Sequence, residues 1–304
     1  MIGLALEGGA DRCAFTAGVV DVLMQHQFYA SAASGTSAGA GCVLNYRSKQ
    51  PGLFRQMMLM QNEKPYFGIC HMLRTGRFLN LNEMASQYAE QLNFPDYFRF
   101  SMQTDCVATC CENGESAYLT GNNKKVEILQ ALQASCALPM ICAPVEIDGR
   151  HYVDGSIADP IPFQHLLEQG CQKVIVVLTG HDGCQPTDYR KFRPLLSVAY
   201  RKRYPALHHA LLHRIARYQE QIVRMQQAQK TGAVFVIQPE VRSIPLFTRD
   251  TQKIDQYYRH GCELTERIWP TLETWLSAEN TPKSHFFSFL IEAFDIFLYF
   301  GSIF

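Results

Sequence analysis

The chain has 304 residues, of which 47% are hydrophobic and 18% are charged, so it holds enough apolar material for a sizeable core and is not a disordered protein. Lys and Arg together number 28, as do Asp and Glu, and this balance predicts neither nucleic-acid binding nor a strongly acidic partner. The 11 cysteines and an amino terminus without a signal-peptide pattern indicate free thiols and a cytoplasmic protein.

The first half of the chain alternates short apolar runs with helical patterns. A strand over residues 2–6 precedes a Gly-rich turn and a helix over 14–25, and a strand over 29–33 precedes a small-residue turn and a helix to about residue 46. Later segments continue the pattern: strands over 102–109, 115–119, 173–178 and 234–238, a helix over 124–135, and a hairpin over 145–153 that turns at Asp148-Gly149. This alternation predicts an α/β fold whose mostly parallel sheet is covered on both faces.

Ser37 lies at the centre of a Gly-x-Ser-x-Gly stretch that begins at Gly35 and ends at Gly39. Small residues around a serine permit the sharp strand-to-helix turn called a nucleophile elbow, which exposes the hydroxyl above the sheet edge. An ordinary turn of small residues remains the alternative for this stretch taken alone.

A second turn, Gly8-Gly9-Ala10-Asp11-Arg12, follows the first predicted strand and precedes a helix. Backbone N–H groups at such a position are free to hold the oxyanion of a tetrahedral intermediate. The alternative of a dinucleotide-binding turn requires the pattern G-x-G-x-x-G, and Cys13 stands where its last glycine belongs.

Asp154 follows the predicted hairpin and begins the stretch Asp-Gly-Ser. A carboxylate on a tight turn can accept the proton of a serine hydroxyl as that serine attacks, so no histidine is required. Taken alone, an Asp-Gly pair is better explained as a plain turn, and its occurrence with the other two motifs is what favours a catalytic role.

The three motifs together resemble the patatin-like phospholipase family: Glu-Gly-Gly-x-x-Arg from Glu7, Gly-x-Ser-x-Gly from Gly35 and Asp-Gly-Ser from Asp154. The resemblance covers about residues 2–178. It implies a three-layer α/β/α fold and a cofactor-free enzyme that cleaves lipid esters through an acyl-enzyme. It also implies roles for individual residues: Ser37 as nucleophile, Asp154 as base, Gly8, Gly9 and Ala10 as the oxyanion loop, and Arg12 as the basic residue of that loop.

Two positions depart from the family pattern, which usually has glycine where Ala10 and Cys13 stand. A Cβ at Ala10 opposes positive φ, and the Asp11 carboxylate opposes negative charge at an oxyanion unless it points to solvent or pairs with Arg12. A catalytically weak or inactive patatin-fold protein that binds lipid or a partner therefore stays open, as does an acyltransferase.

Other constellations compete with this interpretation. An ordinary α/β-hydrolase would need a downstream histidine, for which His208, His209 and His213 are candidates. The cluster of Cys106, Cys110 and Cys111 lacks paired zinc-ligand spacing, and the two histidines at 209 and 213 lack the Glu of H-E-x-x-H, so we predict no metal site.

We expect one catalytic domain over residues 1–280, with the motif-bearing core at 2–178 and a helical part at 190–280. Residues 190–224 carry nine Lys or Arg and a single acid, Glu220. This basic segment is equally consistent with a surface that contacts anionic lipid and with a solvated helix face. Residues 284–304 are predicted to form an apolar amphipathic helix that packs on the core or a second subunit, or lies in a membrane interface.

Overall fold

The computed structural model describes residues 1–60, 79–120, 125–248 and 250–278. Within these ranges the chain forms one 8-stranded sheet with the strand order β5-β6-β3-β2-β1-β7-β8, and β4 also pairs with β3. Strands β3, β2, β1, β7 and β8 run parallel, whereas β4, β5 and β6 pair antiparallel. The strands are β1 Ile2–Leu6, β2 Ala32–Thr36, β3 Gln103–Cys110, β4 Ser116–Leu119, β5 Val145–Ile147, β6 Arg150–Asp154, β7 Lys173–Val177 and β8 Val234–Ile237.

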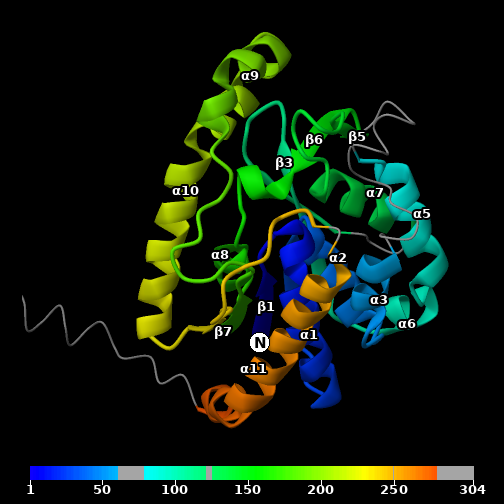
Figure 1. Ribbon diagram of the computed structural model, residues 1–304, viewed down its shortest axis with the longest axis vertical. Helices are drawn as coiled ribbons and strands as arrows, with labels where there is room; N and C mark the ends of the chain where they lie inside the picture. The colour runs from blue at the N-terminus through cyan, green and yellow to red at the C-terminus, as the bar shows by residue number, and fades with distance from the viewer. Residues whose placement is uncertain (61–78, 121–124, 249, 279–304) are drawn as a thin grey trace, which may run out of the picture.

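Helices cover both faces of the sheet (Figure 1). Those on the face of α1 and α2 include α11, and the opposite face is covered by α8 and α10. The helices are α1 Cys13–Gln25, α2 Ala38–Arg47, α3 Leu53–Met60, α5 Leu81–Gln91, α6 Phe94–Arg99, α7 Lys125–Ser135, α8 Phe163–Glu168, α9 Arg193–Tyr200, α10 Pro205–Lys230 and α11 Thr251–Ser277. Three short 3-10 turns are η1 Ala10–Arg12, η2 Gly155–Ile157 and η3 Tyr189–Phe192.

Strand β7 shows why the sheet is buried on both sides. Its side chains point alternately to the two faces, as in any strand. Ile175 and Val177 pack with the α1 side, whereas Val174 and Val176 pack with the α8 and α10 side. Each of these four side chains is 0% exposed. The predicted three-layer α/β/α architecture is therefore confirmed.

The expected second strand was placed three residues too early. Residues 29 and 30 lie in a loop, where the Tyr29 ring packs at a tilt against Tyr46 and the Ala30 N–H donates to the Tyr46 hydroxyl at 3.0 Å. Strand β2 instead spans Ala32–Thr36, so the first two residues of the predicted turn, Gly35 and Thr36, belong to the sheet. Small side chains suit this strand because α2 packs closely over its end.

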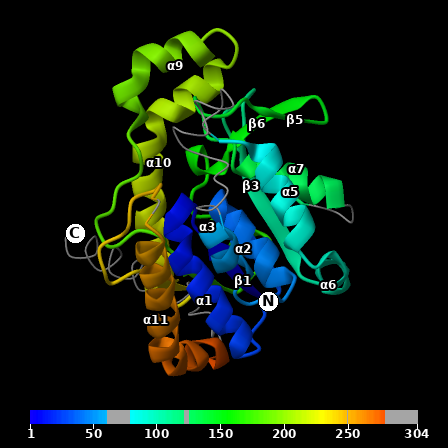
Figure 2. The same cartoon turned by 45° about the vertical axis from the view of Figure 1, so that its right-hand side comes forward.

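Helix α11, the last described helix, packs against α1 (Figure 2). One glycine on each helix allows the close contact. A Cβ at Gly18 would lie 2.2 Å from the carbonyl oxygen of Tyr258, and one at Gly261 would lie 2.2 Å from that of Phe15. Only glycine permits so close a crossing of two helix backbones. The C-terminal segment is thus joined to the motif-bearing part by direct backbone contact.

The predicted helix over residues 284–304 lies outside the described residues. Across the helices that the structure does describe, none is both long and apolar enough to cross a bilayer. The proposed division into a domain over 1–280 with a core at 2–178 stays a prediction.

Candidate active site

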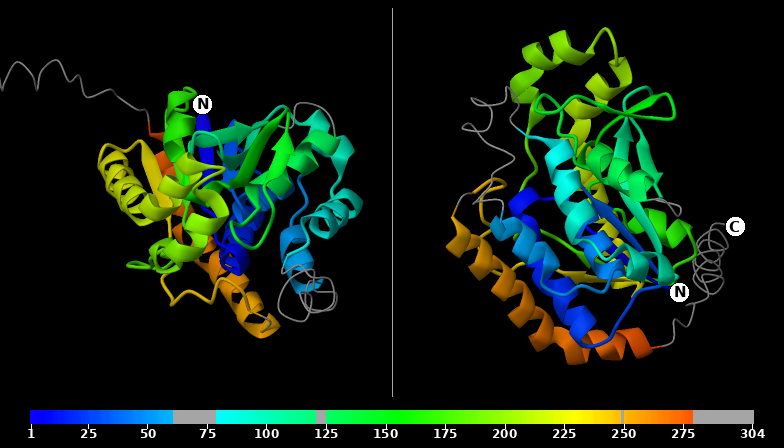
Figure 3. Two further views of the ribbon diagram at one scale, coloured as in Figure 1. Left: turned by 90° about the horizontal axis from the view of Figure 1, so that it is seen from above. Right: turned by 90° about the vertical axis from the view of Figure 1, so that its right-hand side faces the viewer.

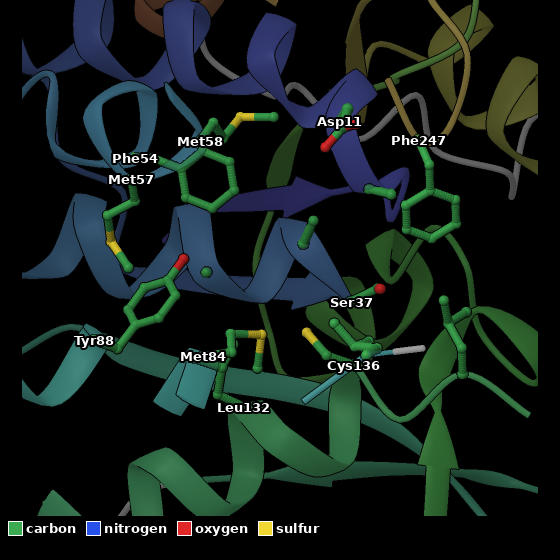
Figure 4. A pocket seen from close by; sticks show the side chains of 15 residues that line it. Asp11, Ser37, Phe54, Met57, Met58, Met84, Tyr88, Leu132, Cys136 and Phe247 are labelled. Carbon is green, nitrogen blue, oxygen red and sulfur yellow. The ribbon is translucent and has the colours of Figure 1, made fainter. Parts of the chain in front are cut away.

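Ser37 occupies the turn between β2 and α2 with the backbone angles φ 55° and ψ −127°. This conformation is strained for a residue with a side chain and is held here by close packing on both sides. A Cβ at Gly35 would lie 2.4 Å from the Gly39 carbonyl oxygen, and a Cβ at Gly39 would lie 2.7 Å from that of Glu7. The two glycines therefore allow the sharp turn that presents the Ser37 side chain to the pocket (Figure 4).

Asp154, the last residue of β6, lies directly beside this serine. Its Oδ2 accepts a hydrogen bond from Ser37 Oγ at 2.7 Å, and its Oδ1 accepts one from the Ser156 N–H at 2.9 Å. The residue is 0% exposed. Burial raises the pKa of its carboxyl, while the hydrogen bonds from Ser37 and Ser156 and the charge of Arg214 offset part of that rise.

A second serine, Ser135, is hydrogen-bonded to the backbone of the turn that carries Ser37. Ser135 Oγ accepts a hydrogen bond from the Ser37 N–H at 2.8 Å and donates one to the Val107 carbonyl oxygen at 2.6 Å. Ser135 is the last residue of α7 and is 0% exposed. The sequence analysis did not single it out, because nothing in its local pattern distinguishes it from an ordinary helix-terminal serine.

Arg214 on α10 supports the turn that carries Asp154. Its Nε donates to the Ser156 carbonyl oxygen at 2.9 Å and its Nη2 donates to Ser156 Oγ at 3.1 Å. On the next turn of α10, Arg217 donates to the Ile157 carbonyl oxygen at 3.2 Å. The guanidinium groups of Arg214 and Arg217 are therefore bound to the protein itself. These two cations do not add to the basic surface that was expected over residues 190–224.

The predicted oxyanion loop lies between the ends of β2 and β7. A Cβ at Gly8 would lie 2.9 Å from the Thr36 carbonyl oxygen, and one at Gly9 would lie 2.5 Å from Thr179 Oγ1. Within the described part of the chain, the N–H groups of Gly8 and Ala10 donate to no protein oxygen, whereas the Gly9 N–H interacts with the Cys13 thiol. The N–H groups of Gly8 and Ala10 are thus available to a ligand.

Ala10 adopts φ +48°, the left-handed region that its Cβ disfavours. The alanine therefore does not prevent the loop from turning, but the turn carries backbone strain. Cys13, the other departure from the family pattern, is 0% exposed and its thiol faces the Glu7 carbonyl oxygen at 3.6 Å.

Glu7, which directly precedes the predicted oxyanion loop, is held by hydrogen bonds from two other segments. Its carboxylate accepts hydrogen bonds from Thr179 Oγ1 and from the Tyr218 hydroxyl, both at 2.9 Å, and from the Thr179 N–H at 2.5 Å. Burial raises the pKa of this carboxyl. Its position at the head of the first motif was visible in the sequence, but its structural role was not.

The side chains of Arg12 and Asp11 do not pair with each other. Each forms a hydrogen bond with the backbone of the segment after β8. Arg12 donates from Nε to the Ile244 carbonyl oxygen at 2.8 Å and from Nη1 to Cys184 Sγ at 3.2 Å. Asp11 is 6% exposed and accepts a hydrogen bond from the Thr248 N–H at 2.6 Å. The carboxylate therefore neither points to solvent nor pairs with Arg12, and burial raises its pKa to about 6.

An apolar cavity of about 90 Å³ opens beside Ser37 (Figure 4). Asp11 and Phe247 lie near the serine end of this cavity. The other end is enclosed by large apolar side chains from α3, α5 and α7, namely Phe54, Met57, Met58, Met84, Tyr88 and Leu132. A cavity of this shape and lining suits an acyl chain whose carbonyl carbon lies at Ser37.

The competing histidines lie on α10 and do not line this cavity. His208 Nε2 is 3.1 Å from Ser197 Oγ, and His213 Nδ1 is 2.9 Å from the His209 carbonyl oxygen. The structure does not bring any of the three to Ser37. Across the described ranges, no group of three or more His, Cys, Asp or Glu residues is arranged to hold a metal ion.

The sequence profile of the patatin-like phospholipase family matches residues 4–167, which is more than half of the chain. The chain therefore belongs to this family, in agreement with the resemblance carried by the motifs at Glu7, Ser37 and Asp154. A second profile, described as a domain of unknown function (DUF6363), matches residues 204–277. This range contains α10, β8 and all of α11.

Among curated proteins, the uncharacterized protein YjjU of Escherichia coli strain K12 is 30% identical to this chain over 192 residues. The match covers 59% of this chain and 52% of YjjU, so the chain spans about half the length of that relative. Among solved structures, VipD from Legionella pneumophila is similar with a TM-score of 0.45 and 13% identity. That similarity covers 88% of this chain and 66% of VipD.

Proposed function

We propose that the chain is a serine acyl hydrolase that cleaves lipid carboxylic esters with Ser37 as nucleophile and Asp154 as base. The observation that carries the proposal is the 2.7 Å hydrogen bond to the fully buried Asp154 carboxylate from the Oγ of Ser37, which itself lines an apolar cavity. A nucleophile within hydrogen-bond reach of a base is the arrangement that activates a serine hydroxyl.

In the first half of the reaction, Asp154 takes the Ser37 proton as Oγ attacks the ester carbonyl carbon. The backbone N–H groups of the Gly8, Gly9 and Ala10 loop face the developing oxyanion, and each such donor is worth about 100- to 1,000-fold in kcat. The protonated carboxyl then gives its proton to the departing alcohol oxygen, leaving the acyl group on Ser37.

In the second half, Asp154 takes a proton from water as the water oxygen attacks the acyl-enzyme. The resulting intermediate expels Ser37 Oγ, which regains its proton from Asp154 and releases the carboxylic acid. Burial favours this role because it raises the basicity of the carboxylate relative to an exposed aspartate. The steps require no cofactor.

The lining of the cavity supports an apolar acyl group as the part of the substrate that is recognised. Its methionines are flexible and polarizable, so they adapt to an alkyl chain. The buried Asp11 at the serine end adds a negative charge above about pH 6, which opposes anionic groups close to the nucleophile.

The test is hydrolysis of a chromogenic medium-chain acyl ester by the wild type, Ser37→Ala and Asp154→Asn. We expect both variants to lose about 100-fold or more in kcat. Ser101→Ala and Asp182→Asn, which change exposed residues, serve as matched controls and should retain full activity. Covalent labelling of the wild type by a fluorophosphonate, followed by peptide mass analysis, should locate the label at Ser37.

Three outcomes would change the proposal. Activity that survives Asp154→Asn but not Ser37→Ala would assign the base to another group. Product that carries the acyl group on an added alcohol rather than water would make the same dyad an acyltransferase. A folded wild type that neither hydrolyses esters nor reacts with the fluorophosphonate would replace the enzyme with a lipid-binding protein of the same fold.

A further inference from the structure

Helix α9 stands at one end of the molecule, beyond the rest of the sheet layers (Figures 1 and 3). One of its faces is anchored: Leu196 is 0% exposed and Tyr200 is 6% exposed. They pack with Val153 and Ile157 next to the turn that carries Asp154. The helix is therefore a fixed part of the fold rather than a loosely attached one.

The other face of this segment is apolar and exposed. Phe192 is 45% exposed, Leu195 is 54% exposed and Val198 is 86% exposed. Their spacing of three residues places them along one side of the η3–α9 segment. Single exposed apolar residues are ordinary, whereas three in a row on a projecting helix form an apolar stripe that water does not favour.

Cations flank this apolar stripe at both ends. Lys191 and Arg193 stand at its start, and Arg201, Lys202 and Arg203 follow its end. All five are exposed. The chain contains no Asp or Glu from residue 189 to residue 219. An apolar stripe between clusters of cations matches a bilayer surface that carries anionic headgroups.

The nearby acidic groups already have partners within the protein. Asp188 is paired with Arg190 at 2.9 Å, and Glu112 is 3.0 Å from His151 Nδ1. These pairs leave the five flanking cations as the charges that the end of the molecule presents. Unlike Arg214 and Arg217, whose guanidinium groups bind backbone oxygens, these five residues are exposed, and the Arg203 guanidinium lies over the Tyr204 ring at 5.1 Å.

Helix α9, which carries the stripe, is hydrogen-bonded to a segment that lines the Ser37 cavity. The Tyr200 hydroxyl accepts a hydrogen bond from the Met140 N–H at 2.8 Å. Met140 is 37% exposed, and Leu138, two residues earlier, lines the cavity. In the 3-10 turn before α9, burial raises the pKa of Tyr189 to about 12, and the charge of Asp154 adds to that rise. A bilayer that meets α9 therefore lies on the side of the molecule where the catalytic residues are found.

We propose that the apolar stripe Phe192, Leu195 and Val198, with its five flanking cations, docks the protein on membranes that contain anionic lipid. In this arrangement α9 enters the headgroup region and the cavity mouth faces the bilayer. The purpose of docking, to supply lipid esters to Ser37, rests on the proposed function. The docking itself does not, because no catalytic group takes part in it.

The experiment measures co-sedimentation of the full chain carrying Ser37→Ala, so that hydrolysis cannot alter the vesicles. The vesicles are phosphatidylcholine alone and phosphatidylcholine mixed with phosphatidylglycerol. We expect binding to the mixed vesicles and little to the neutral ones. Binding should weaken strongly in about 1 M salt, where the Debye length falls to about 3 Å.

Two double variants test the stripe and the cations separately. Leu195→Ser with Val198→Ser should weaken binding by at least about tenfold. Arg201→Gln with Lys202→Gln should weaken it by about fivefold for each cation removed. None of these residues is in the proposed catalytic machinery, so hydrolysis of a water-soluble ester by the same variants with Ser37 restored should stay unchanged.

Matched controls change the same residue types elsewhere on the surface. Val223→Ser with Val241→Ser removes apolar side chains that are 52% and 45% exposed, and Lys230→Gln with Arg242→Gln removes two cations. Both controls should bind like the parent.

Several results would overturn the proposal. These are equal binding to neutral and mixed vesicles, unchanged binding by both α9 variants, and losses in the controls as large as those in the α9 variants. Binding of a single-stranded nucleic acid in preference to anionic vesicles would identify the cations with a different partner. Vesicle binding that behaves as expected in a protein without esterase activity would sink only the proposed function.

Discussion

Arg214 and Ser156 join the two profile-matched parts of the chain at the active site: the guanidinium donates to both the carbonyl oxygen and the hydroxyl of Ser156. Ser156 in turn donates its N–H to Asp154 Oδ1 at 2.9 Å. Helix α10, in the segment of unknown function, therefore positions the proposed base. This segment is a structural component of the site rather than a separate appendage.

Replacing Arg214 by Gln should impair the base without touching substrate. The guanidinium lowers the pKa of Asp154, so its removal lets burial raise that pKa further. A base works above its pKa, and the acid limb of the pH–kcat profile should therefore move to higher pH, with kcat at neutral pH falling about tenfold. KM should change little.

The control is Arg224→Gln on the same helix, where the arginine pairs with Glu220 at 2.6 Å on the exposed side. Arg214→Lys should keep the position of the acid limb closer to that of the wild type, because it keeps the charge. An acid limb that does not move in Arg214→Gln would show that the arginine has only a structural role.

Ala10 is the position at which local strain and chain entropy oppose each other. Relief of the left-handed φ by Ala10→Gly should stabilise by about 1–2 kcal/mol, whereas the extra freedom of glycine in the unfolded chain costs about 0.5–1 kcal/mol. We expect a net change within about 1 kcal/mol and undiminished activity. Urea unfolding and ester hydrolysis measure the two quantities.

Ala10→Val makes the same test in the opposite direction. A β-branched side chain at positive φ is a severe outlier, so the variant should lose more than about 1 kcal/mol of stability and most of its activity. Equal stability of the valine and alanine proteins would mean that the loop relaxes out of the left-handed region.

Asp11 should make the stability of the protein depend on pH. Its pKa is about 6 in the folded protein and near 3.8 when exposed. A folded-state pKa that is raised favours the folded protein below about pH 3.8, and this contribution disappears as pH rises through about 6. The difference corresponds to about 3 kcal/mol.

Asp11→Asn retains an oxygen that accepts from Thr248 but carries no charge. Its free energy of unfolding should therefore fall less than that of the wild type between about pH 4 and pH 7. Urea midpoints across this range measure the difference. Asp148→Asn at an exposed hairpin turn is the control and should follow the wild type. Parallel profiles for Asp11→Asn and the wild type would exclude ionisation of Asp11 as the cause.

Gly41 offers a way to shorten the acyl cavity. A Cβ there would lie 2.2 Å from the Tyr88 hydroxyl oxygen and 2.8 Å from Phe54 Cε2, both of which line the cavity. Gly41→Ala should therefore displace these rings into the space for the chain. We expect the ratio of kcat/KM for long over short acyl esters to fall by about tenfold or more.

Tyr88→Phe combined with Gly41→Ala is the companion variant, since it removes the hydroxyl that the added methyl group meets first. It should recover part of the activity on long esters. Equal losses on short and long esters would place the acyl chain elsewhere.

The local sequence determined the elements and the motifs. Residues 173–177 form a strand because both of its faces are apolar from Val174 onward, and the turns at Ser37 and Asp148-Gly149 follow from small residues and from the turn preference of Asp-Gly. Seven of the predicted segments agree with the structure within one residue at each end. The patatin-like family was readable for the same reason, because its three motifs are contiguous stretches.

Only the tertiary structure decided which side chains meet. Ser135, Arg214 and Tyr218 reach the site from segments 58 to 211 residues away from their partners, and no local pattern marks them. The same is true of Asp11, whose burial under Thr248 depends on the segment after β8. Periodicity records how a residue relates to its near neighbours in the chain. Contacts between distant segments instead depend on how the sheet and its helices pack, and that packing fixes the proton affinity of each buried carboxyl.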